Sequence, residues 1–236
     1  MANLDLLENS IPVAPLKLAA LPGSMEMAKK VDSYLVQFRK ELAERRNGVS
    51  FSGYSEDSFL IDCECPRFGS GEAKGKINES VRGADLYILV DVCNYSITYK
   101  VCGYENHMSP DDHYQDLKRV IAAMGGKARR VTVVMPMLYE GRQHRRNGRE
   151  SLDAALMLQE LVHMGVSNII TFDAHDPRIS NAIPLAGFDD VQATYQMIKA
   201  LVRAVPDISL NKKDTIVISP DEGGMSRCMY YSSVLK

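Results

Sequence analysis

His175 is the residue best placed for chemistry, because it follows an apolar run of strand length and has acidic neighbours. The run covers residues 168–172, and Asp173 and Asp176 flank the histidine. A neutral imidazole can ligate a metal or accept a proton, and a neighbouring carboxylate can fix its tautomer. The pattern therefore predicts a metal-binding or acid–base group, with a structural histidine as the alternative.

Asp221 offers a carboxylate in a similar place. It follows the apolar run 215–218 and precedes Gly223 and Gly224, where the backbone can approach a ligand closely. Mg²⁺ favours one or two protein carboxylates together with substrate phosphates. We therefore expect Asp221 to lie near a metal; the alternative is a capping residue ahead of a helix over residues 225–234.

Four arginines follow a third apolar run, residues 131–135. Guanidinium groups clasp phosphate oxygens in pairs and stay charged at any working pH. The cluster therefore predicts a phosphate-binding edge, whereas the alternative is a solvated basic loop that pairs with Glu140 and Glu150. The four are Arg142, Arg145, Arg146 and Arg149.

The elements that must position these groups are strands and helices in alternation. Strands are expected over residues 86–90, 131–135, 168–172 and 215–218, with a strand-rich stretch over 49–65. Helices are expected over residues 24–46, 109–124, 151–164 and 190–205. Continuous apolar runs are typical of strands covered on both faces, so the fold class is α/β with a doubly wound, mostly parallel sheet. Ligands bind beyond the carboxyl ends of such strands, and the three polar segments should therefore open on one edge.

Local signals set the ends of these helices. Serine N-caps are expected at Ser24, Ser109 and Ser151, and ends at glycine after Asn47, after Met124 and at Gly165. Residues 93–108 form an irregular segment with several tyrosines.

Composition fits a globular protein of one large or two small domains. The 236 residues are 45% hydrophobic and 25% charged, with a net charge of −2, which argues against a general nucleic-acid binder. No apolar run approaches the ~20 residues that a membrane span requires. The N-terminus lacks the basic region of a signal peptide.

The five cysteines favour a reducing, cytoplasmic location, because they form neither a CxxC pair nor an even-numbered framework. They are Cys63, Cys65, Cys93, Cys102 and Cys228. Cys63 and Cys65 would face the same way on a strand, so a metal clip is one interpretation. No second ligand pair of zinc-like spacing follows, and we expect small apolar strand residues instead.

Two familiar nucleotide-binding motifs are absent. The stretch 69–71 lacks the third glycine of a dinucleotide-binding turn, and residues 73–77 after it have strand character. No Walker A sequence occurs either, so any use of ATP must follow another design.

Five short motifs, taken in order, resemble the ribose-phosphate diphosphokinase family, also called PRPP synthetases. They are Arg-Phe-x-x-Gly-Glu (67–72), Glu-Ser-Val-Arg-Gly (79–83), Arg-Gln-x-Arg (142–145), Asp-x-His (173–175) and Ser-Pro-Asp-x-Gly-Gly (219–224). The match runs from about residue 18 to the end of the sequence. The ordered series is specific, although no single motif is.

The resemblance implies phosphoribosyltransferase-like α/β domains and a transferase of nucleotide biosynthesis. An N-terminal arm over residues 1–17 would precede a first domain over 18–165, and residues 166–236 would begin an incomplete second domain. The implied reaction transfers diphosphate from Mg-ATP to ribose 5-phosphate, giving 5-phosphoribosyl diphosphate (PRPP) and AMP. The implied assembly is a homo-oligomer, a hexamer in the family, with no nucleic acid or membrane as partner.

The resemblance also implies an ATP site made of two loops. Phe68, Ser70 and Glu72 would form an adenine-side loop that serves the site of a neighbouring subunit. Arg142 and Gln143 would hold ATP.

Three further residues receive roles in the same way. His175 and Asp221 would lie near Mg²⁺ and the reacting groups, as metal-binding and catalytic residues. Arg82 would line a regulatory phosphate or ADP site.

The sequence departs from the family pattern in ways that define a divergent branch. Ser70 replaces an acidic or amide side chain of many relatives, His144 replaces an acid, and residues 93–115 exceed the usual connection. The chain also stops before the family's flexible catalytic loop and its ribose-5-phosphate loop. We therefore expect an enzyme represented by its first two-thirds; if the protein instead ended at Lys236, we would expect no AMP formation from ATP and ribose 5-phosphate. The alternative is a non-catalytic nucleotide- or phosphate-binding regulatory subunit.

Overall fold

The chain is divided into two compact units. The computed structural model describes residues 13–45, 56–210 and 214–235. One unit comprises Met1–Asp190 and the other Val191–Lys236. The first unit continues past residue 165, where we expected the second domain to begin, because the strand at 168–172 joins its sheet.

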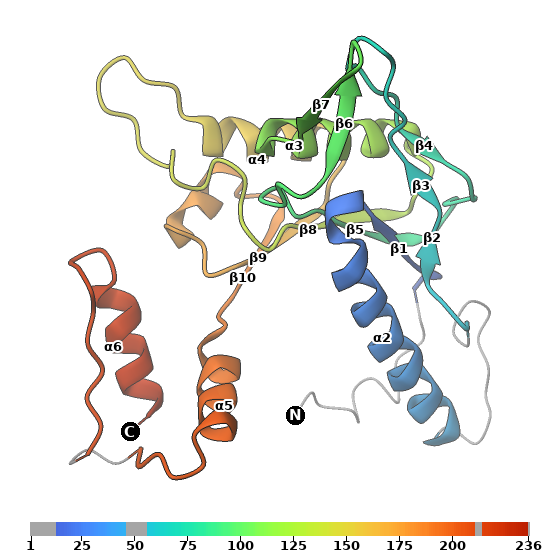
Figure 1. Cartoon of the computed structure of the whole chain (residues 1–236). Coiled ribbons are helices and arrows are strands. Elements are labelled where there is room, and N and C mark those ends of the chain that lie inside the picture. The colour runs from blue at the N-terminus through green and yellow to red at the C-terminus, as the bar shows by residue number, and fades with distance from the viewer. Residues whose placement is uncertain (1–12, 46–55, 211–213, 236) are drawn as a thin grey trace. The chain divides into compact units, whose positions relative to one another are not determined.

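A six-stranded sheet forms the centre of the first unit (Figure 1). Its spatial order is β10-β9-β8-β5-β1-β2, and the pairs from β9 through β8, β5 and β1 to β2 are parallel. The strands are β1 (Leu16–Ala20), β2 (Leu60–Ile61), β5 (Asp85–Leu89), β8 (Arg130–Val134), β9 (Asn168–Phe172) and β10 (Gly187–Val191). The expected α/β fold with a mostly parallel sheet is confirmed.

Alternate residues along the central strand β5 supply the cores on the two faces of this sheet. Leu86 and Ile88 are fully buried with helices α3 (Pro110–Ala123) and α4 (Asp153–His163). Leu89 belongs to a smaller core beneath helix α2 (Met25–Arg45) on the opposite face. Burial of each such side chain stabilises the fold by roughly 1.5–3 kcal/mol, so helices on both faces hold the strands that carry the loops.

The expected start and end of α3 are confirmed. The Ser109 hydroxyl accepts a hydrogen bond from the Asp112 backbone N–H at 3.2 Å, and the Asp112 carboxylate accepts one from the Ser109 N–H at 2.9 Å. This reciprocal capping box satisfies two donors at the helix start. The helix ends ahead of Gly125 and Gly126, which have φ of 54° and 67°, and α4 likewise ends before Gly165 at φ 95°.

The other two expected serine caps are wrong. Ser24 lies in the short 3₁₀ helix η1 (Pro22–Ser24), and its buried hydroxyl has no hydrogen-bond partner among the described residues. Ser151 lies one residue too early, because α4 has Leu152 at its N-cap and the Ser151 hydroxyl donates to the Asp153 carboxylate. The predicted stop after Asn47 lies outside the described residues.

A small antiparallel pair extends from the β2 edge of the sheet. Strands β3 (Cys63–Glu64) and β4 (Lys76–Ile77) pair in register Cys63–Ile77, and an isolated bridge joins Arg67 to Ala73. The described part of the expected strand-rich stretch 49–65 contains β2 and β3, and the β3–β4 pair frames the loop over residues 67–72. Of the expected N-terminal arm, residues 1–12 lie outside the described part, and residues 16–17 belong to β1.

The segment over residues 93–108, expected to be irregular, contains a hairpin. Strands β6 (Thr98–Val101) and β7 (Tyr104–His107) are antiparallel and joined by Cys102 and Gly103. Both turn residues have positive φ, 49° and 88°, as a two-residue hairpin turn that matches strand twist requires. A cysteine in the first turn position is not a usual turn signal, which is why the sequence did not predict this hairpin.

The second unit contains helices α5 (Thr194–Ala204) and α6 (Met225–Val234). The expected helix over 190–205 begins later, because residues 187–191 form β10. The expected strand over 215–218 is wrong within the described part of this unit, where Ile216 and Ile218 are 80% and 75% exposed. A strand needs a neighbour to accept its backbone hydrogen bonds, and this segment has no paired strand there.

The described helices do not meet the length and apolarity that crossing a membrane would demand.

Candidate functional site

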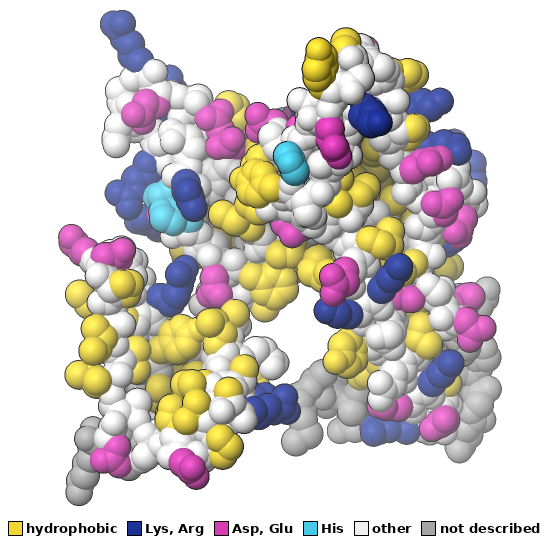
Figure 2. Space-filling model, viewed as in Figure 1, with side chains coloured by type: hydrophobic (Ala, Val, Ile, Leu, Met, Phe, Trp, Pro, Cys, Tyr) yellow, Lys and Arg dark blue, Asp and Glu magenta, His cyan; other side chains and the backbone are white. Residues whose placement is uncertain are grey.

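The loops after β8 and β9 bring together two of the predicted chemical groups. These strands are adjacent and parallel, so the loops that follow them open on the same edge of the sheet. The first loop carries the four arginines and His144, and the second carries His175. Figure 2 shows histidine surface bordered by lysine or arginine side chains in this part of the first unit.

Two histidines from the two loops lie against each other. The His144 and His175 ring centroids are 5.2 Å apart with an interplanar angle of 60°. The His144 Nδ1 atom lies 3.1 Å from the Asp176 carboxylate, and both side chains are only 11% exposed. His144 therefore connects the β8 loop to the β9 loop through one polar contact with Asp176 and one ring contact with His175.

Arg178 fixes the carboxylate that holds His144. Its guanidinium donates to both Asp176 oxygens at 2.6–3.2 Å, and its backbone N–H donates at 3.0 Å. The hydrogen bonds from Arg178 hold the pKa of Asp176 well below its usual range, outweighing the opposing effect of burial. Asp176 is thus a fixed anion that can orient the His144 ring.

The backbone ahead of His175 is held in an uncommon conformation. Asp173 has φ of 46°, in the left-handed region, and the next N–H, of Ala174, donates to the Asp190 carboxylate at 2.9 Å. Asp190 belongs to β10, so it is a strand residue rather than the helix start that we expected. The edge strand therefore positions the loop that carries His175.

A cavity of about 710 Å³ opens beside these two loops. Its polar wall combines cationic, amide and imidazole groups, with Asp176 already paired to Arg178. The remaining wall is apolar and comes from α4 and the 3₁₀ helix η2 (Pro177–Ala182). The polar lining residues are His144, Arg145, Gln159, Asp176, Arg178 and Asn181.

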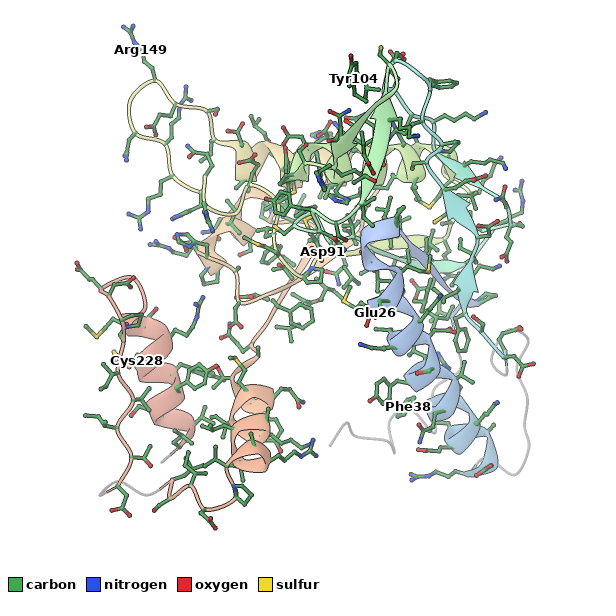
Figure 3. The ribbon with its side chains drawn as sticks, in the orientation of Figure 1. Glu26, Phe38, Asp91, Tyr104, Arg149 and Cys228 are labelled. Carbon is green, nitrogen blue, oxygen red and sulfur yellow. The ribbon has the colours of Figure 1, made fainter. Side chains whose placement is uncertain are left out.

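The four arginines of the β8 loop form no ion pair with any residue in the described ranges. The two glutamates that might neutralise them have other surroundings. Glu150 accepts the Asn147 backbone N–H at 3.1 Å. Burial, with Asp153 and Asp111 nearby, raises the pKa of Glu140. The arginine cluster is therefore a positive edge without an internal counterion, and Figure 3 shows Arg149 directed away from the body of the unit.

Gln143 anchors the base of this loop. Its side-chain amide donates to the Ser151 carbonyl at 2.8 Å and to the Arg145 carbonyl at 3.2 Å, and its own carbonyl accepts the Ala154 N–H at 3.3 Å. The Gln143 side chain thus closes the loop, while the neighbouring Arg142 is exposed.

A pair of stacked tyrosines supports the same loop from the core. Tyr139, ahead of the arginines, stacks on Tyr114 of α3 with centroids 4.4 Å apart and planes at 11°. The Tyr139 hydroxyl donates to Asp111 at 2.6 Å and the Tyr114 hydroxyl to Glu160 of α4 at 2.7 Å. The arginines therefore extend from a base that α3 and α4 hold.

The Phe68–Glu72 loop is not part of this cluster. It lies between β3 and β4, beyond the β2 edge of the sheet, whereas β8 and β9 lie toward the β10 edge (Figure 1). Phe68 is 53% exposed, and Ser70 and Glu72 are also exposed, with the Ser70 hydroxyl donating to Glu72 at 2.9 Å. One chain therefore presents the two predicted nucleotide-binding loops at different ends of one sheet.

Arg82 and the histidine pair lie at opposite ends of the parallel strands. Arg82 belongs to the turn before β5, where the next residue, Gly83, has φ of 70°. Its side chain is exposed, and its backbone N–H is 3.4 Å from the Ser80 hydroxyl. The structure thus places Arg82 at the amino ends of the strands.

Asp221 belongs to the second unit. Its carboxylate accepts the Gly224 N–H at 2.9 Å just before α6, as a residue shaping a helix start does. It follows an extended segment that is not a paired strand, so the argument that placed it at a strand end is wrong. No group of three or more metal-ligating side chains occurs in residues 13–45, 56–210 and 214–235.

The cysteine clip also lacks support. Cys63 and Cys65 are free thiols that donate to the Ala20 and Asp116 carbonyls at 3.4 and 3.7 Å. Burial raises the pKa of Cys65 to about 12, and a protonated thiol is a poor metal ligand. Both pack against the main core, as apolar strand residues would.

The pairing of His144 with Asp176 and Arg178 is the feature that sequence reasoning missed. The residues lie far apart in the chain, and only the parallel pairing of β8 and β9 brings them together. The available signal was the acidic residue beside His175.

Comparison with known proteins gives one family. The model for the N-terminal domain of ribose phosphate pyrophosphokinase matches residues 16–165. The ribose-phosphate pyrophosphokinase of Oceanobacillus iheyensis is 29% identical over 184 residues, which are 75% of this chain and 50% of the relative. That of Bacillus caldolyticus is 28% identical over 225 residues, 94% of this chain and 58% of the relative. The chain thus spans about half the length of the curated relatives it matches.

A solved structure supports the fold. The phosphoribosylpyrophosphate synthetase of Mycobacterium smegmatis superposes with a TM-score of 0.70 at 22% identity, covering 94% of this chain and 61% of the other.

Proposed function

Because the chain belongs to the ribose-phosphate pyrophosphokinase family, we propose that its protein transfers diphosphate from Mg-ATP to the 1-hydroxyl of ribose 5-phosphate. The products are PRPP and AMP, for nucleotide biosynthesis. The observation that carries the proposal is the edge formed by the β8 and β9 loops, where unpaired arginines lie beside the His144–His175 contact. Such an edge can bind a polyphosphate and stabilise the negative charge that shifts between its phosphate groups during transfer.

The roles proposed within the site follow from charge and position. Arg142 holds ATP phosphate oxygens, and Gln143 keeps the loop in the shape that presents it. His175 lies at the reacting groups, as a hydrogen-bond donor or a proton acceptor. Phe68, Ser70 and Glu72 contact the adenine of ATP bound to a neighbouring subunit of a homo-oligomer, a hexamer in this proposal.

Magnesium is the proposed metal, and the protein would bind it jointly with the phosphates of ATP. Asp221 supplies one carboxylate, and His175 is the second proposed ligand, although its imidazole suits Mg²⁺ less well than oxygen does. Asp221 and His175 would hold the ion together with phosphate oxygens of ATP. When bound, the ion neutralises charge on the transferred diphosphate.

The proposed reaction is an in-line attack of the sugar 1-hydroxyl on the β-phosphorus of ATP. The O–P bond to the sugar forms as the bond between the α,β-bridging oxygen and the β-phosphorus breaks, AMP leaves with that oxygen, and the hydroxyl proton passes to His175 or to solvent. Protein residues contribute position and charge: the arginines hold the phosphates, and Asp176 orients His144 beside His175.

Two further roles are part of the proposal. Arg82, exposed at the other edge of the sheet, lines a regulatory phosphate or ADP site. The five free cysteines fit a reducing, cytoplasmic location.

The test is AMP formation by the intact protein from ATP and ribose 5-phosphate with Mg²⁺. We expect turnover that depends on all three components. Nucleotide binding without AMP formation would instead support the regulatory-subunit alternative. Absence of both binding and turnover would contradict the family-based proposal.

A further inference from the structure

The loop that carries Phe68, Ser70 and Glu72 is held by its backbone. The Phe68 N–H donates to the Glu72 carbonyl at 2.7 Å and the Gly71 N–H to the Phe68 carbonyl at 2.9 Å. The side chains of Phe68, Ser70 and Glu72 are exposed, so the contacts that fix the loop leave these three side chains available.

Helix α3 holds the base of the loop. Arg67 pairs with Asp116 of α3 at 2.8 Å, where the two side chains are 12% and 3% exposed. Gly75 lies so close to α3 that an added Cβ atom would be 2.2 Å from the Arg119 carbonyl oxygen. These contacts fix where the loop leaves the sheet, and the Arg67 guanidinium also donates to the Gly71 carbonyl at 3.3 Å.

The β6–β7 hairpin holds the tip. The Cys102 N–H donates to the Gly69 carbonyl at 2.8 Å. Gly71 has φ of 92°, and a Cβ atom there would lie 2.8 Å from the Val101 side chain. Figure 1 shows the end of the hairpin reaching the loop between β3 and β4. The positive φ and the close approach of the Val101 side chain both favour glycine at this position.

The two faces of strand β6 differ in their exposure to solvent. Tyr99 and Val101 are half-buried, whereas Thr98 and Lys100 are exposed. Tyr99 lies under the Arg67 guanidinium at 4.4 Å from its ring centroid and donates its hydroxyl to Asp112 at 3.2 Å. One face of the hairpin therefore contacts the loop and α3, and the other is exposed.

We propose that the β6–β7 hairpin is a positioning element for the Phe68–Glu72 loop. By fixing Gly69 and Gly71 it sets the direction in which Phe68 and Glu72 meet a nucleotide, without touching the nucleotide itself. The inference rests on the proposed function for its ligand, because the exposed side chains of this loop are the proposed adenine contacts. Preorganisation of this kind raises affinity by removing the cost of ordering a loop on binding.

The chain offers a clean way to remove the hairpin. Ile97 and Met108 face each other at its base, where the Met108 N–H donates to the Ile97 carbonyl at 2.8 Å. An Asn-Gly pair can replace residues 98–107, because this dipeptide favours the two-residue turn that closes such a pair. Val101→Ala keeps the hairpin but removes most of its contact with Gly71. Lys100→Ala, on the exposed face of the same strand, is the matched control.

Hydrogen exchange of residues 67–73 and equilibrium binding of ATP, measured on the intact protein, test the proposal. We expect the Phe68 and Gly71 amides to exchange about tenfold faster in the shortened variant, with a smaller rise in Val101→Ala and none in Lys100→Ala. We expect the Kd for ATP to rise about tenfold in the shortened variant and to follow the same order. Val101→Ala carries the test if the shortened variant does not fold.

Two outcomes would overturn the inference. Unchanged exchange in the loop would show that α3 alone fixes it, and faster exchange with unchanged ATP affinity would show that loop order does not matter for binding. If the wild-type protein binds no ATP, the proposed function fails, while the exchange measurement still decides whether the hairpin holds the loop.

Discussion

The two predicted nucleotide-binding loops of this chain are built in opposite ways. The loop over residues 67–72 is contacted at its base by α3 and at its tip by the β6–β7 hairpin. The loop over residues 142–149 is anchored at its base by Gln143, and its four arginines have no ion-pair partner in the described parts of the chain. The first loop therefore has a fixed conformation, whereas the second carries positive charge that the described residues do not neutralise.

This difference corresponds to what each loop has to recognise. An adenine ring is a flat apolar surface that should bind more tightly to a loop already held in place, because ordering a loop on binding costs free energy. A polyphosphate carries several negative charges, and arginine side chains can bind its oxygens in pairs. Because the loops lie at different ends of one sheet, the proposed function requires a second subunit to bring the two kinds of contact to one ATP molecule.

The largest effect is expected from His175 and Asp221. His175→Ala or Asp221→Ala should lower kcat for AMP formation by ~10²-fold or more, the size typical of one lost electrostatic or acid–base contribution. Steady-state kinetics on the intact protein measures this. His163→Ala on α4, where the exposed ring is hydrogen-bonded to the Gln159 carbonyl at 2.8 Å, is the control histidine. Wild-type turnover in either mutant would remove that residue from the site.

The charged loop should respond unevenly to loss of its arginines. Arg142→Ala should raise the KM for ATP about tenfold, because it removes a bidentate phosphate contact. Arg149→Ala, at the outward tip of the same loop, should change it less than about twofold. Equal effects of the two substitutions would mean that the loop acts only through its net charge. High salt should then abolish both effects.

The fold that carries these loops was largely predictable, and the reason is burial. Continuous apolar runs such as 86–90 and 131–135 identified the central strands, because both faces of the sheet are covered. The Ser109 capping box and the glycines after α3 marked that helix correctly, because their effects are local. The strand predicted over residues 215–218 was wrong, because apolar character predicts burial but does not show whether a neighbouring strand is available for pairing.

The site was predictable only in part. That His175 and the arginines lie at one edge of the sheet was predictable, because the loops after adjacent parallel strands open on the same edge. The His144–Asp176 pair was not found, because it depends on the neighbourhood of two strands rather than on sequence spacing. The β6–β7 hairpin was missed because its turn, Cys102–Gly103, lacks the usual Asn or Asp.

A smaller effect, on stability, concerns the support of the charged loop. Burial alone would raise the pKa of Glu160, but hydrogen bonds from Lys118 and Tyr114 lower it below its usual value. A group with a lowered folded-state pKa stabilises the protein above its unfolded-state pKa, about 4.3 for glutamate, and loses that contribution as the pH falls. Because the Glu160 side chain is 44% exposed and solvent screens its charge, Glu160→Gln should lower the free energy of unfolding by only about 0.5 kcal/mol at neutral pH and by less at about pH 3.

Denaturant unfolding at the two pH values measures this difference. Glu26→Gln is the matched control, because Glu26 forms an exposed i,i+4 pair with Lys30 and should contribute little at either pH. A pH-independent loss in Glu160→Gln would show that packing, rather than charge, links α3 to α4.

Mixing two inactive variants tests the central claim most directly, namely that each ATP site takes its charged loop from one subunit and its aromatic loop from another. One variant carries His175→Ala and the other carries Phe68→Ala with Glu72→Ala. In randomly mixed symmetric dimers about a quarter of the sites would then receive two wild-type loops, so the mixture should recover about a quarter of wild-type AMP formation. Activity no greater than the sum of the separate variants, in subunits shown to exchange, would contradict the account.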